Sequence, residues 1–330
     1  MSTVDVRRLG PWILLAAGLL VGIALQTQLY PASERVVGTV FMFVALATAW
    51  NLIGGFTGYA CFGQVGFFGL GAYLTAIFMY HGHLSFWLAM PLSGILAGLF
   101  AAFVGAPLLR LKGHYFAVAT LGVAEGLREV VINLPKLTGG GGGITVPTFG
   151  PDAPTRWLGN DGFYLLFLFI AGAVIAVALV VSRSRGGYAL RAIHQDEDAA
   201  AAMGINTTRA KTLAFACSAA LTGSVGAAHA FQIQAIYPEP SFDVGVTVLM
   251  VVMVVLGGAG TVLGPVLGAV GIAYASEWLR ENYTNLHTFL LGGLIIVAVV
   301  LLPQGFVNYL GDALRTRRFS LLDNVRRYRL

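Results

Sequence analysis

Residues 244–275 read VGVTVLMVVMVVLGGAGTVLGPVLGAVGIAYA, a run of 32 residues without one charged side chain. As a single α-helix this run would extend about 48 Å at ~1.5 Å per residue. The hydrocarbon core of a bilayer is only ~30 Å thick. The glycines at 257–260 and Pro265 interrupt the run, so we expect two helices, 244–256 and 262–278. The first is short for a crossing, and a re-entrant segment is the alternative.

Apolar runs of this kind recur along all 330 residues. Hydrophobic residues make up 57% of the chain and charged residues 11%, where a soluble domain has roughly 25% charged. Glycine is enriched, with 43 residues, as it is in membrane helices. The composition predicts an all-α polytopic membrane protein, a single transmembrane domain over 1–330 with about 8–10 transmembrane or re-entrant helices. The other candidate crossings lie near 11–29, 36–53, 61–80, 86–109, 114–133, 163–181, 212–233 and 287–302.

The distribution of positive charge predicts the orientation. If the N-terminus is inside and ten crossings alternate, the inside segments hold 15 of the 20 basic residues, as the positive-inside rule requires. Both termini are then cytoplasmic, as are the loop 182–211 and the basic tail 312–330. The net charge of +5 is explained by this orientation and by contact with membrane lipid, so we expect no nucleic-acid partner.

Several kinds of chemistry are missing from the sequence. No GxxxxGK[ST] motif occurs, so ATP binding through a P-loop is not expected. No HExxH motif occurs, and we predict no metal site. Ser224 and His229 share one apolar segment, but five positions on a helix place side chains about 140° apart. A serine protease within the membrane is therefore not expected, and the chain is predicted not to be an enzyme.

The inside loop contains an unusual run, DEDAAAAMGIN, at 196–206. Acidic groups in a first helical turn are stabilised by the helix dipole, and alanine has the best helix propensity. Gly204 can end a helix in the left-handed conformation, and Asn206 or Thr207 can cap the following one. The pattern predicts a short helix from about Asp196 to Met203, outside the bilayer. It is either a solvated connector or a docking element, and the alanine patch favours docking.

The same loop carries a family resemblance. Asp198-Ala199-Ala200-x-x-x-Gly204 resembles the EAA-x-x-x-G coupling motif of ABC importer permeases, with Asp in place of Glu. Residues 191–206 are similar to the corresponding loop of branched-chain amino-acid permeases of the LivM type. The resemblance covers about 40–303 and departs at Gly141-Gly142 and in a longer basic tail. Three further parts of the chain resemble this family. They are 51–58 together with 63–73, the segment that begins with 115–122 and ends with 137–140, and the segment that begins with 253–260 and ends with 265–269.

The resemblance implies an ABC importer permease bundle in a bacterial cytoplasmic (inner) membrane, importing branched-chain or related amino acids. Implied partners are a second permease subunit of the LivH type, two cytoplasmic ATPase subunits and a periplasmic or extracellular solute-binding protein. ATP and Mg would be bound by the ATPases, so this chain itself would hold no cofactor. The implied ATPase-coupling residues are Arg191, Asp196, Glu197, Asp198, Ala199, Ala200, Gly204 and Ile205.

Two alternatives stay open for the function. Urea and short-chain amide permeases look similar, so the solute is not fixed. A self-sufficient secondary transporter would use intramembrane carboxylates for ion coupling, and their scarcity outside Glu125 and Glu129 counts against it.

A solute pathway is the remaining expectation. Glu125 either meets the solute ammonium, as intramembrane ionisable residues often do, or pairs locally with Arg128 three positions on. Glycine helix breaks could offer backbone N–H groups to the solute carboxylate. The candidate pathway residues are Gly54, Gly55, Thr120, Glu125, Gly257 and Gly258.

Overall fold

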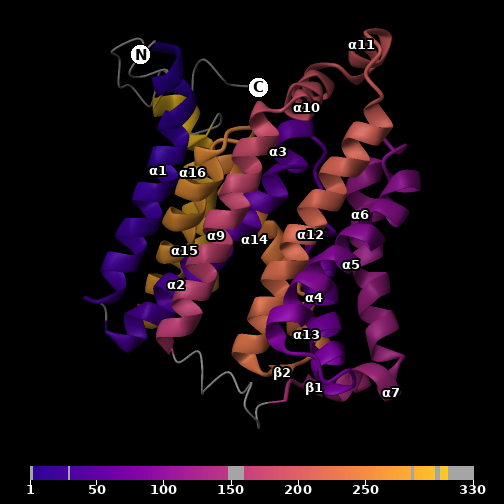
Figure 1. The fold of residues 1–330 in the computed structure, drawn as a ribbon, viewed down its shortest axis with the longest axis vertical. Helices are drawn as coiled ribbons and strands as arrows, with labels where there is room; N and C mark the ends of the chain where they lie inside the picture. The colour runs from indigo at the N-terminus through magenta and orange to yellow at the C-terminus, as the bar shows by residue number, and fades with distance from the viewer. Residues whose placement is uncertain (1–2, 29, 148–159, 284–285, 302–304, 311–330) are drawn as a thin grey trace.

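Ten long helices form a bundle in the computed structural model, which describes residues 1–330 apart from 1–2, 29, 148–159, 284–285, 302–304 and 311–330 (Figure 1). The predicted tail 312–330 therefore lies outside the described residues. The long helices are α1 (Thr3–Gln26), α2 (Pro31–Asn51), α4 (Gln64–Tyr80), α5 (Phe86–Leu108), α6 (His114–Ile132), α9 (Asn160–Arg183), α12 (Thr207–Ile233), α14 (Val244–Gly257), α15 (Leu263–Asn282) and α16 (His287–Leu301).

Short elements connect these helices at both ends of the bundle. A two-stranded antiparallel sheet pairs Ile144 with Ile236. The short elements are α3 (Gly54–Thr57), α7 (Pro135–Thr138), the 3-10 helix η1 (Gly140–Gly142), β1 (Ile144–Thr145), α10 (Arg185–Gln195), α11 (Glu197–Ala202), β2 (Ala235–Ile236) and α13 (Pro238–Ser241).

The helices confirm the prediction of an all-α polytopic membrane protein. Seven segments of the described chain are long and apolar enough to cross a membrane, and α4 is a shorter apolar helix. The long 244–275 run is split as predicted, because α14 ends at Gly257 and α15 begins at Leu263. Pro265 does not interrupt α15, because it lies in the first turn of that helix, where the backbone N–H has no partner within the helix. α14 joins α13 in one apolar stretch, Pro238–Gly257.

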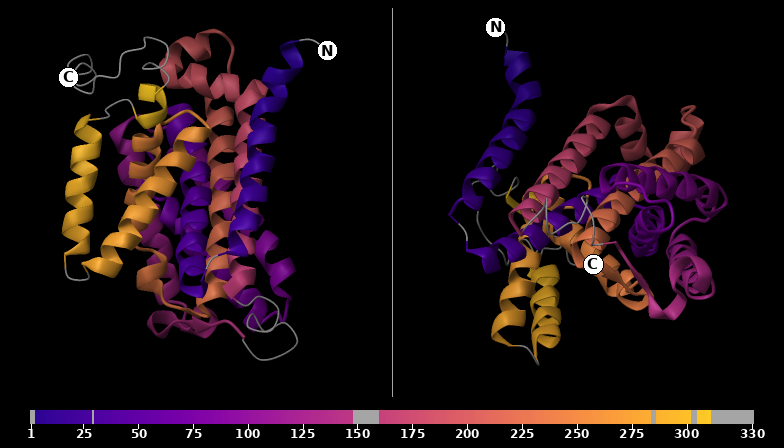
Figure 2. Two further views of the ribbon diagram at one scale, coloured as in Figure 1. Left: turned by 90° about the vertical axis from the view of Figure 1, so that its left-hand side faces the viewer. Right: turned by 60° about the horizontal axis from the view of Figure 1, so that its bottom comes forward.

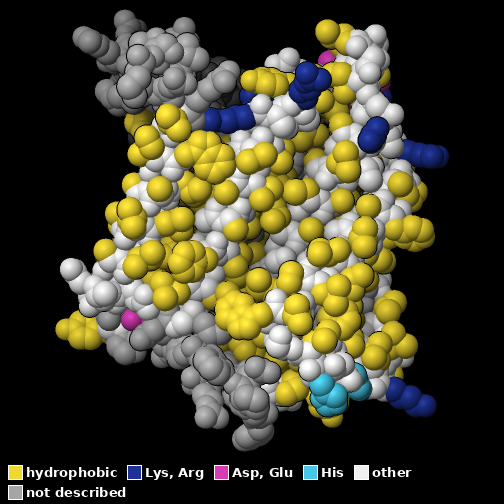
Figure 3. Space-filling model, in the orientation of Figure 1, with side chains coloured by type: hydrophobic (Ala, Val, Ile, Leu, Met, Phe, Trp, Pro, Cys, Tyr) yellow, Lys and Arg dark blue, Asp and Glu magenta, His cyan; other side chains and the backbone are white. Residues whose placement is uncertain are grey.

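The two ends of the bundle differ. α10 and α11 lie at one end, which we call the α11 end, and the β1–β2 sheet lies at the other (Figure 1). The space-filling view shows apolar side chains covering the middle of the molecule, with most of the visible Lys and Arg side chains near the α11 end (Figure 3). The N-terminal end of α1 lies at this same end (Figure 2). A band of apolar surface across the middle, with Lys and Arg gathered at one end, is the pattern expected of a protein that spans a bilayer.

α12 is the central packing helix, in contact with α4 and α5 along its length. Small residues allow this approach: a Cβ on Gly71 of α4 would lie 2.1 Å from the carbonyl oxygen of Gly223 on α12. A Cβ on Gly226 would likewise lie 2.1 Å from the carbonyl oxygen of Phe68. Close backbone contact through small residues is the main packing device between helices in lipid. α1 and α16 stand at the periphery and bury few side chains.

Replacing Gly71 with Ala should destabilise the bundle, because the new methyl group meets backbone that cannot move aside. We expect a loss of about 1–3 kcal/mol, typical of overpacking, seen as a lower melting temperature of the purified protein by size-exclusion chromatography with fluorescence detection. Gly271→Ala on α15 is the control, since a Cβ there meets nothing within 4 Å. Equal melting temperatures for the two variants would contradict this packing.

Candidate functional site

The loop between α9 and α12 folds into two consecutive helices. Ser184 caps α10, its hydroxyl accepting a hydrogen bond from the backbone N–H of Gly187 at 3.1 Å. Asp196 caps α11, its carboxylate accepting from the N–H groups of Asp198 and Ala199, both at 2.9 Å. These bonds satisfy donors that a helix start leaves unpaired. The predicted short helix at 196–203 is therefore confirmed, as residues 197–202.

A sharp stop follows α11. Gly204 has φ +87°, its N–H donates to the carbonyl of Ala201 at 2.9 Å, and the N–H of Ile205 donates to the carbonyl of Ala200 at 3.1 Å. This is the Schellman arrangement, which favours glycine because its φ is positive. Asn206 then caps α12 by accepting from the N–H of Arg209 at 3.0 Å. The predicted stop at Gly204 is confirmed, and of the two predicted caps for the next helix, Asn206 and Thr207, Asn206 is the one that the structure uses.

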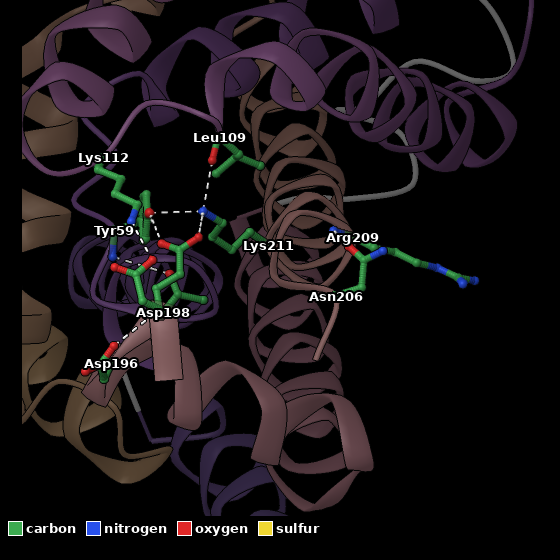
Figure 4. A network of polar contacts seen from close by, with 10 residues as sticks. Tyr59, Leu109, Lys112, Asp196, Asp198, Asn206, Arg209 and Lys211 are labelled. Carbon is green, nitrogen blue, oxygen red and sulfur yellow. Dashed lines mark hydrogen bonds and ion pairs between the residues drawn. The ribbon is translucent and has the colours of Figure 1, made fainter. Parts of the chain in front are cut away.

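A buried ion pair fastens α11 to the bundle (Figure 4). The ammonium of Lys211, on the first turns of α12, lies 2.6 Å from a carboxylate oxygen of Glu197, and the Lys211 side chain is only 2% exposed. It also donates to the carbonyl of Leu109 at 2.9 Å and to the hydroxyl of Tyr59 at 3.0 Å. The Tyr59 hydroxyl in turn donates to Glu197. We call these four residues, Tyr59, Leu109, Glu197 and Lys211, the Lys211 cluster.

The Glu197 carboxylate stays ionised at neutral pH. Burial acts to raise the pKa of Glu197, but hydrogen bonds from Lys211 and Tyr59 outweigh it, and the pKa is lowered. Burial, and then the bond to Glu197, raise the pKa of Tyr59, which stays a neutral donor. All three ammonium protons of Lys211 are used, on Glu197, Tyr59 and Leu109. A buried charge is tolerated only when it is paired and hydrogen-bonded in this way.

Weaker contacts surround the cluster. Lys112, between α5 and α6, pairs with Asp198 at 2.8 Å, but both side chains are largely exposed. Arg191 of α10 donates to the carbonyl of Ser182 at 2.6 Å. A ring nitrogen of His194 lies 3.1 Å from the carbonyl oxygen of Gly55. α10 thus rests on α3, while α11 is attached to α12 and to the loops beside it.

The end of α2 meets the break between α14 and α15 beneath α10. The first predicted break lies at 52–53, and Gly54 and Gly55 begin α3. The amide of Asn51, at the end of α2, donates to the carbonyl of Thr261 at 2.8 Å and accepts from the N–H of Gly260 at 3.1 Å. A Cβ on Gly55 would lie 2.7 Å from that N–H, and Gly54 and Gly55 are buried. The candidate pathway residues Gly54, Gly55, Gly257 and Gly258 are therefore brought to the same end of the bundle. Their role toward a solute stays a prediction.

The other candidate pathway residues lie on α6. Thr120 is buried, and its hydroxyl accepts from the N–H of Phe62 at 3.2 Å. Glu125 pairs with Arg128 at 3.1 Å, the local i, i+3 contact that the sequence suggested as the alternative. Contact with a solute stays a prediction for both Thr120 and Glu125.

One face of α11 is left open. Ala200 is buried against the protein, whereas Ala199, Ala201 and Ala202 are exposed, and Met203 is 83% exposed. Small apolar side chains beside a large exposed methionine form a surface that another protein can approach closely. Of the predicted coupling residues, Glu197, Ala200 and Ile205 face inward or are half-buried, and Arg191, Asp196, Asp198, Ala199 and Gly204 are exposed.

Sequence reasoning missed several residues of this site. Tyr59 and Lys211 hold α11, Lys112 pairs with Asp198 on its exposed side, and Asn51 joins the end of α2 to the break between α14 and α15. One signal pointed to Lys211: it is one of only three lysines and begins an apolar run. Nothing local in the sequence marks Tyr59 as its partner, because 152 positions separate the two.

A bundle of apolar helices with a short helix fastened to one end is the architecture of a membrane permease subunit. The family described as "Branched-chain amino acid transport system / permease component" matches residues 32–299. The chain belongs to this family.

Individual relatives agree with the family match. The high-affinity branched-chain amino acid transport system permease protein LivM of Salmonella typhimurium is 30% identical over 89% of this chain and 74% of its own length. LivM of Escherichia coli K12 is 28% identical over the same shares. LivH of Escherichia coli K12 is 31% identical over 41% of this chain and 44% of its own length. No solved structure matches the chain.

Glu197→Ala should loosen α11, because it leaves the Lys211 ammonium buried without its carboxylate. We expect the free energy of local opening to fall by about 2–4 kcal/mol, measured by hydrogen exchange of the amides at 197–203. In the unmutated chain the carboxylate's contribution is complete above the ordinary Glu pKa of about 4.3. It is lost as pH falls through the lower folded value.

Asp198→Asn is the matched control for this variant. It removes an exposed pair that water screens, so exchange at 197–203 should change little. Equal effects of the two substitutions would contradict the buried-pair interpretation.

Proposed function

We propose that this chain is the permease subunit of an ATP-driven importer for branched-chain amino acids, with its α11 end in the cytoplasm. The names of the LivM and LivH relatives support the solute class. The inside segments of the predicted topology, 182–211 among them, lie at the α11 end, and Lys and Arg side chains gather there, which supports the orientation (Figure 3). The single observation that carries the docking role is α11 itself, a capped helix fixed to the bundle by a buried ion pair.

The partners follow from this proposal. A second permease subunit of the LivH kind completes the pathway, two cytoplasmic ATPases bind α11 and its counterpart, and an external binding protein delivers the solute. ATP and Mg are held by the ATPases. The similarity to both LivM and LivH supports a pair of related permease chains.

Movement of the ATPases would reach the bundle through the contacts of α11. Glu197 passes force to Lys211 on α12 and to Tyr59 before α4, and Leu109 ties the end of α5 to the same point. Force on α10 passes through His194 to Gly55, and Asn51 connects that region to the break between α14 and α15. A force applied to α11 therefore reaches several long helices at once, at the ends of those helices that lie nearest α11.

The solute pathway is the least supported part of the proposal. A charged side chain within a crossing is costly unless it faces protein or water. Glu125 and Glu129 are partly exposed on α6 in the isolated chain, so this face of α6 should turn toward the second permease subunit or the pathway between the two.

Ala202→Arg tests the docking role of α11 without touching the Lys211 cluster. Ala202 is exposed, so the variant should insert and fold normally while it fails to copurify with the ATPase subunits. Leucine uptake by cells that express the complete importer should fall by about tenfold or more, since a bulky charge is placed in a close contact.

Leu134→Arg is the control for this experiment. Leu134 is 47% exposed and directly precedes α7, which lies at the end of the bundle opposite α11 (Figure 1). It should keep ATPase binding. Retention of ATPase by the Ala202→Arg variant would contradict the docking role. Leucine accumulation in liposomes that contain this chain alone would contradict the importer proposal as a whole.

A further inference from the structure

The crossing that contains α4 is divided inside the bundle. α3 ends at Thr57, residues 58–63 are not helical, and α4 begins at Gln64. Gln64 is fully buried, and its carboxamide Nε2 donates to the hydroxyls of Ser218 at 2.8 Å and Thr222 at 2.6 Å. Both hydroxyls lie near the middle of α12, which has 27 residues. α4 therefore starts in the interior of the bundle, where a polar contact joins its first residue to α12.

A further contact fixes the orientation of the Gln64 carboxamide. The hydroxyl of Ser218 donates its single proton to the carbonyl of Ala49 on α2 at 2.6 Å, so it must accept from Gln64. Oε1, on the other side of the carboxamide, accepts a hydrogen bond from no described donor. An unpaired buried acceptor lowers stability, and a methionine would fill a similar volume without that cost. Packing alone therefore does not explain a glutamine at this position.

The residues beside Gln64 are bonded to two other crossings. The N–H of Val65 donates to the hydroxyl of Thr247 on α14 at 3.0 Å, and the N–H of Phe62 donates to the hydroxyl of Thr120 on α6 at 3.2 Å. All the side chains that bond at this point are neutral. Neutral hydrogen bonds are weaker than charge-assisted ones such as those of the Lys211 cluster, so these can be exchanged when helices move.

The face of α12 that bonds to α4 also holds Lys211. Ser218 follows Lys211 by seven positions and Thr222 by eleven, which places both within about 20° of Lys211 around the helix. Phe215 lies between them, and its ring meets that of Phe67 on α4 with 5.2 Å between the ring centres. The contacts with the α4 crossing thus continue along one side of α12 for about 16 Å, at ~1.5 Å per residue. A displacement of α12 acts on that crossing along this whole length.

We propose that Gln64 is a positioning residue for transport, whose carboxamide transmits movement of α12 to α4 inside the bundle. This inference rests on the proposed function, because it gives Gln64 a part in the same coupled movement. The hydroxyl of Thr222 can donate as well as accept, so the carboxamide can bond to α12 through Oε1 when Nε2 is displaced. The start of α4 then follows α12, whereas an apolar contact would let the two helices slide past each other.

The complete importer in liposomes tests this inference, with leucine uptake and ATP hydrolysis measured together. Gln64→Met should lower the number of leucine molecules moved per ATP by about fivefold or more, because the apolar side chain offers α12 no hydrogen bond. Thr222→Val should lower the same ratio, whereas Thr222→Ser, which keeps the hydroxyl, should retain it. Neither residue belongs to the Lys211 cluster, so the ATPase subunits should still copurify with each variant.

Thr75→Val is the matched control. Thr75 is buried on α4, and its hydroxyl donates to that of Ser93 on α5 at 2.8 Å, so this variant also removes a polar contact between two crossings. It should keep the unmutated ratio of leucine to ATP. If Gln64→Met does not assemble, Thr222→Val and Thr222→Ser decide the question by themselves.

Two results would overturn the inference about Gln64. One is an unchanged ratio of leucine to ATP in Gln64→Met or in Thr222→Val, and the other is an equal fall in Thr75→Val and Thr222→Val. Leucine uptake by the unmutated importer that does not depend on ATP would instead contradict the proposed function.

Discussion

The contact between the Lys211 ammonium and the Glu197 carboxylate is the interaction on which the α11 end depends. An unpaired charge in this position would cost several kcal/mol, so replacing or protonating the carboxylate should make α11 open more readily. The remaining donors of Lys211 bind Tyr59 and the carbonyl of Leu109. Three separate parts of the chain therefore converge on one nitrogen atom, and the short helix is held by chemistry that its own six residues could not provide.

Through these contacts, movement of the short helix α11 can be transmitted to the whole bundle. A helix as short as α11 is unstable in isolation, and it is kept in place by the Asp196 cap, the Gly204 stop and the Lys211 cluster. Its attachment points lie where crossings begin or end, at α12, before α4 and after α5. Rigid attachment at helix ends transmits displacement, whereas a flexible linker would absorb it. The exposed alanines and Met203 are left on the outer face, where a partner can reach them.

Much of this fold follows from local patterns in the sequence. Hydropathy and glycine breaks predicted the helices, and capping chemistry predicted α11, Gly204 and Asn206 correctly, because these effects act within a few residues. The Lys211 cluster was not predictable in the same way, since Tyr59, Leu109 and Lys211 are distant in sequence and only packing brings them together. The Glu125–Arg128 pair was predictable as an alternative from its i, i+3 spacing. The meeting of Gly55 with Gly260 through Asn51 depends on how α2 packs on α15, which no local pattern encodes.

The most direct test of the account is a charge exchange across the buried pair in the assembled importer. Leucine uptake would be compared for Glu197→Lys, Lys211→Glu and the double exchange, with surface expression measured for each. The account predicts that each single change lowers uptake by about tenfold or more, because like charges face each other at a buried site, and that the double exchange recovers most of the loss. Single variants that transport leucine at the unmutated rate would contradict it.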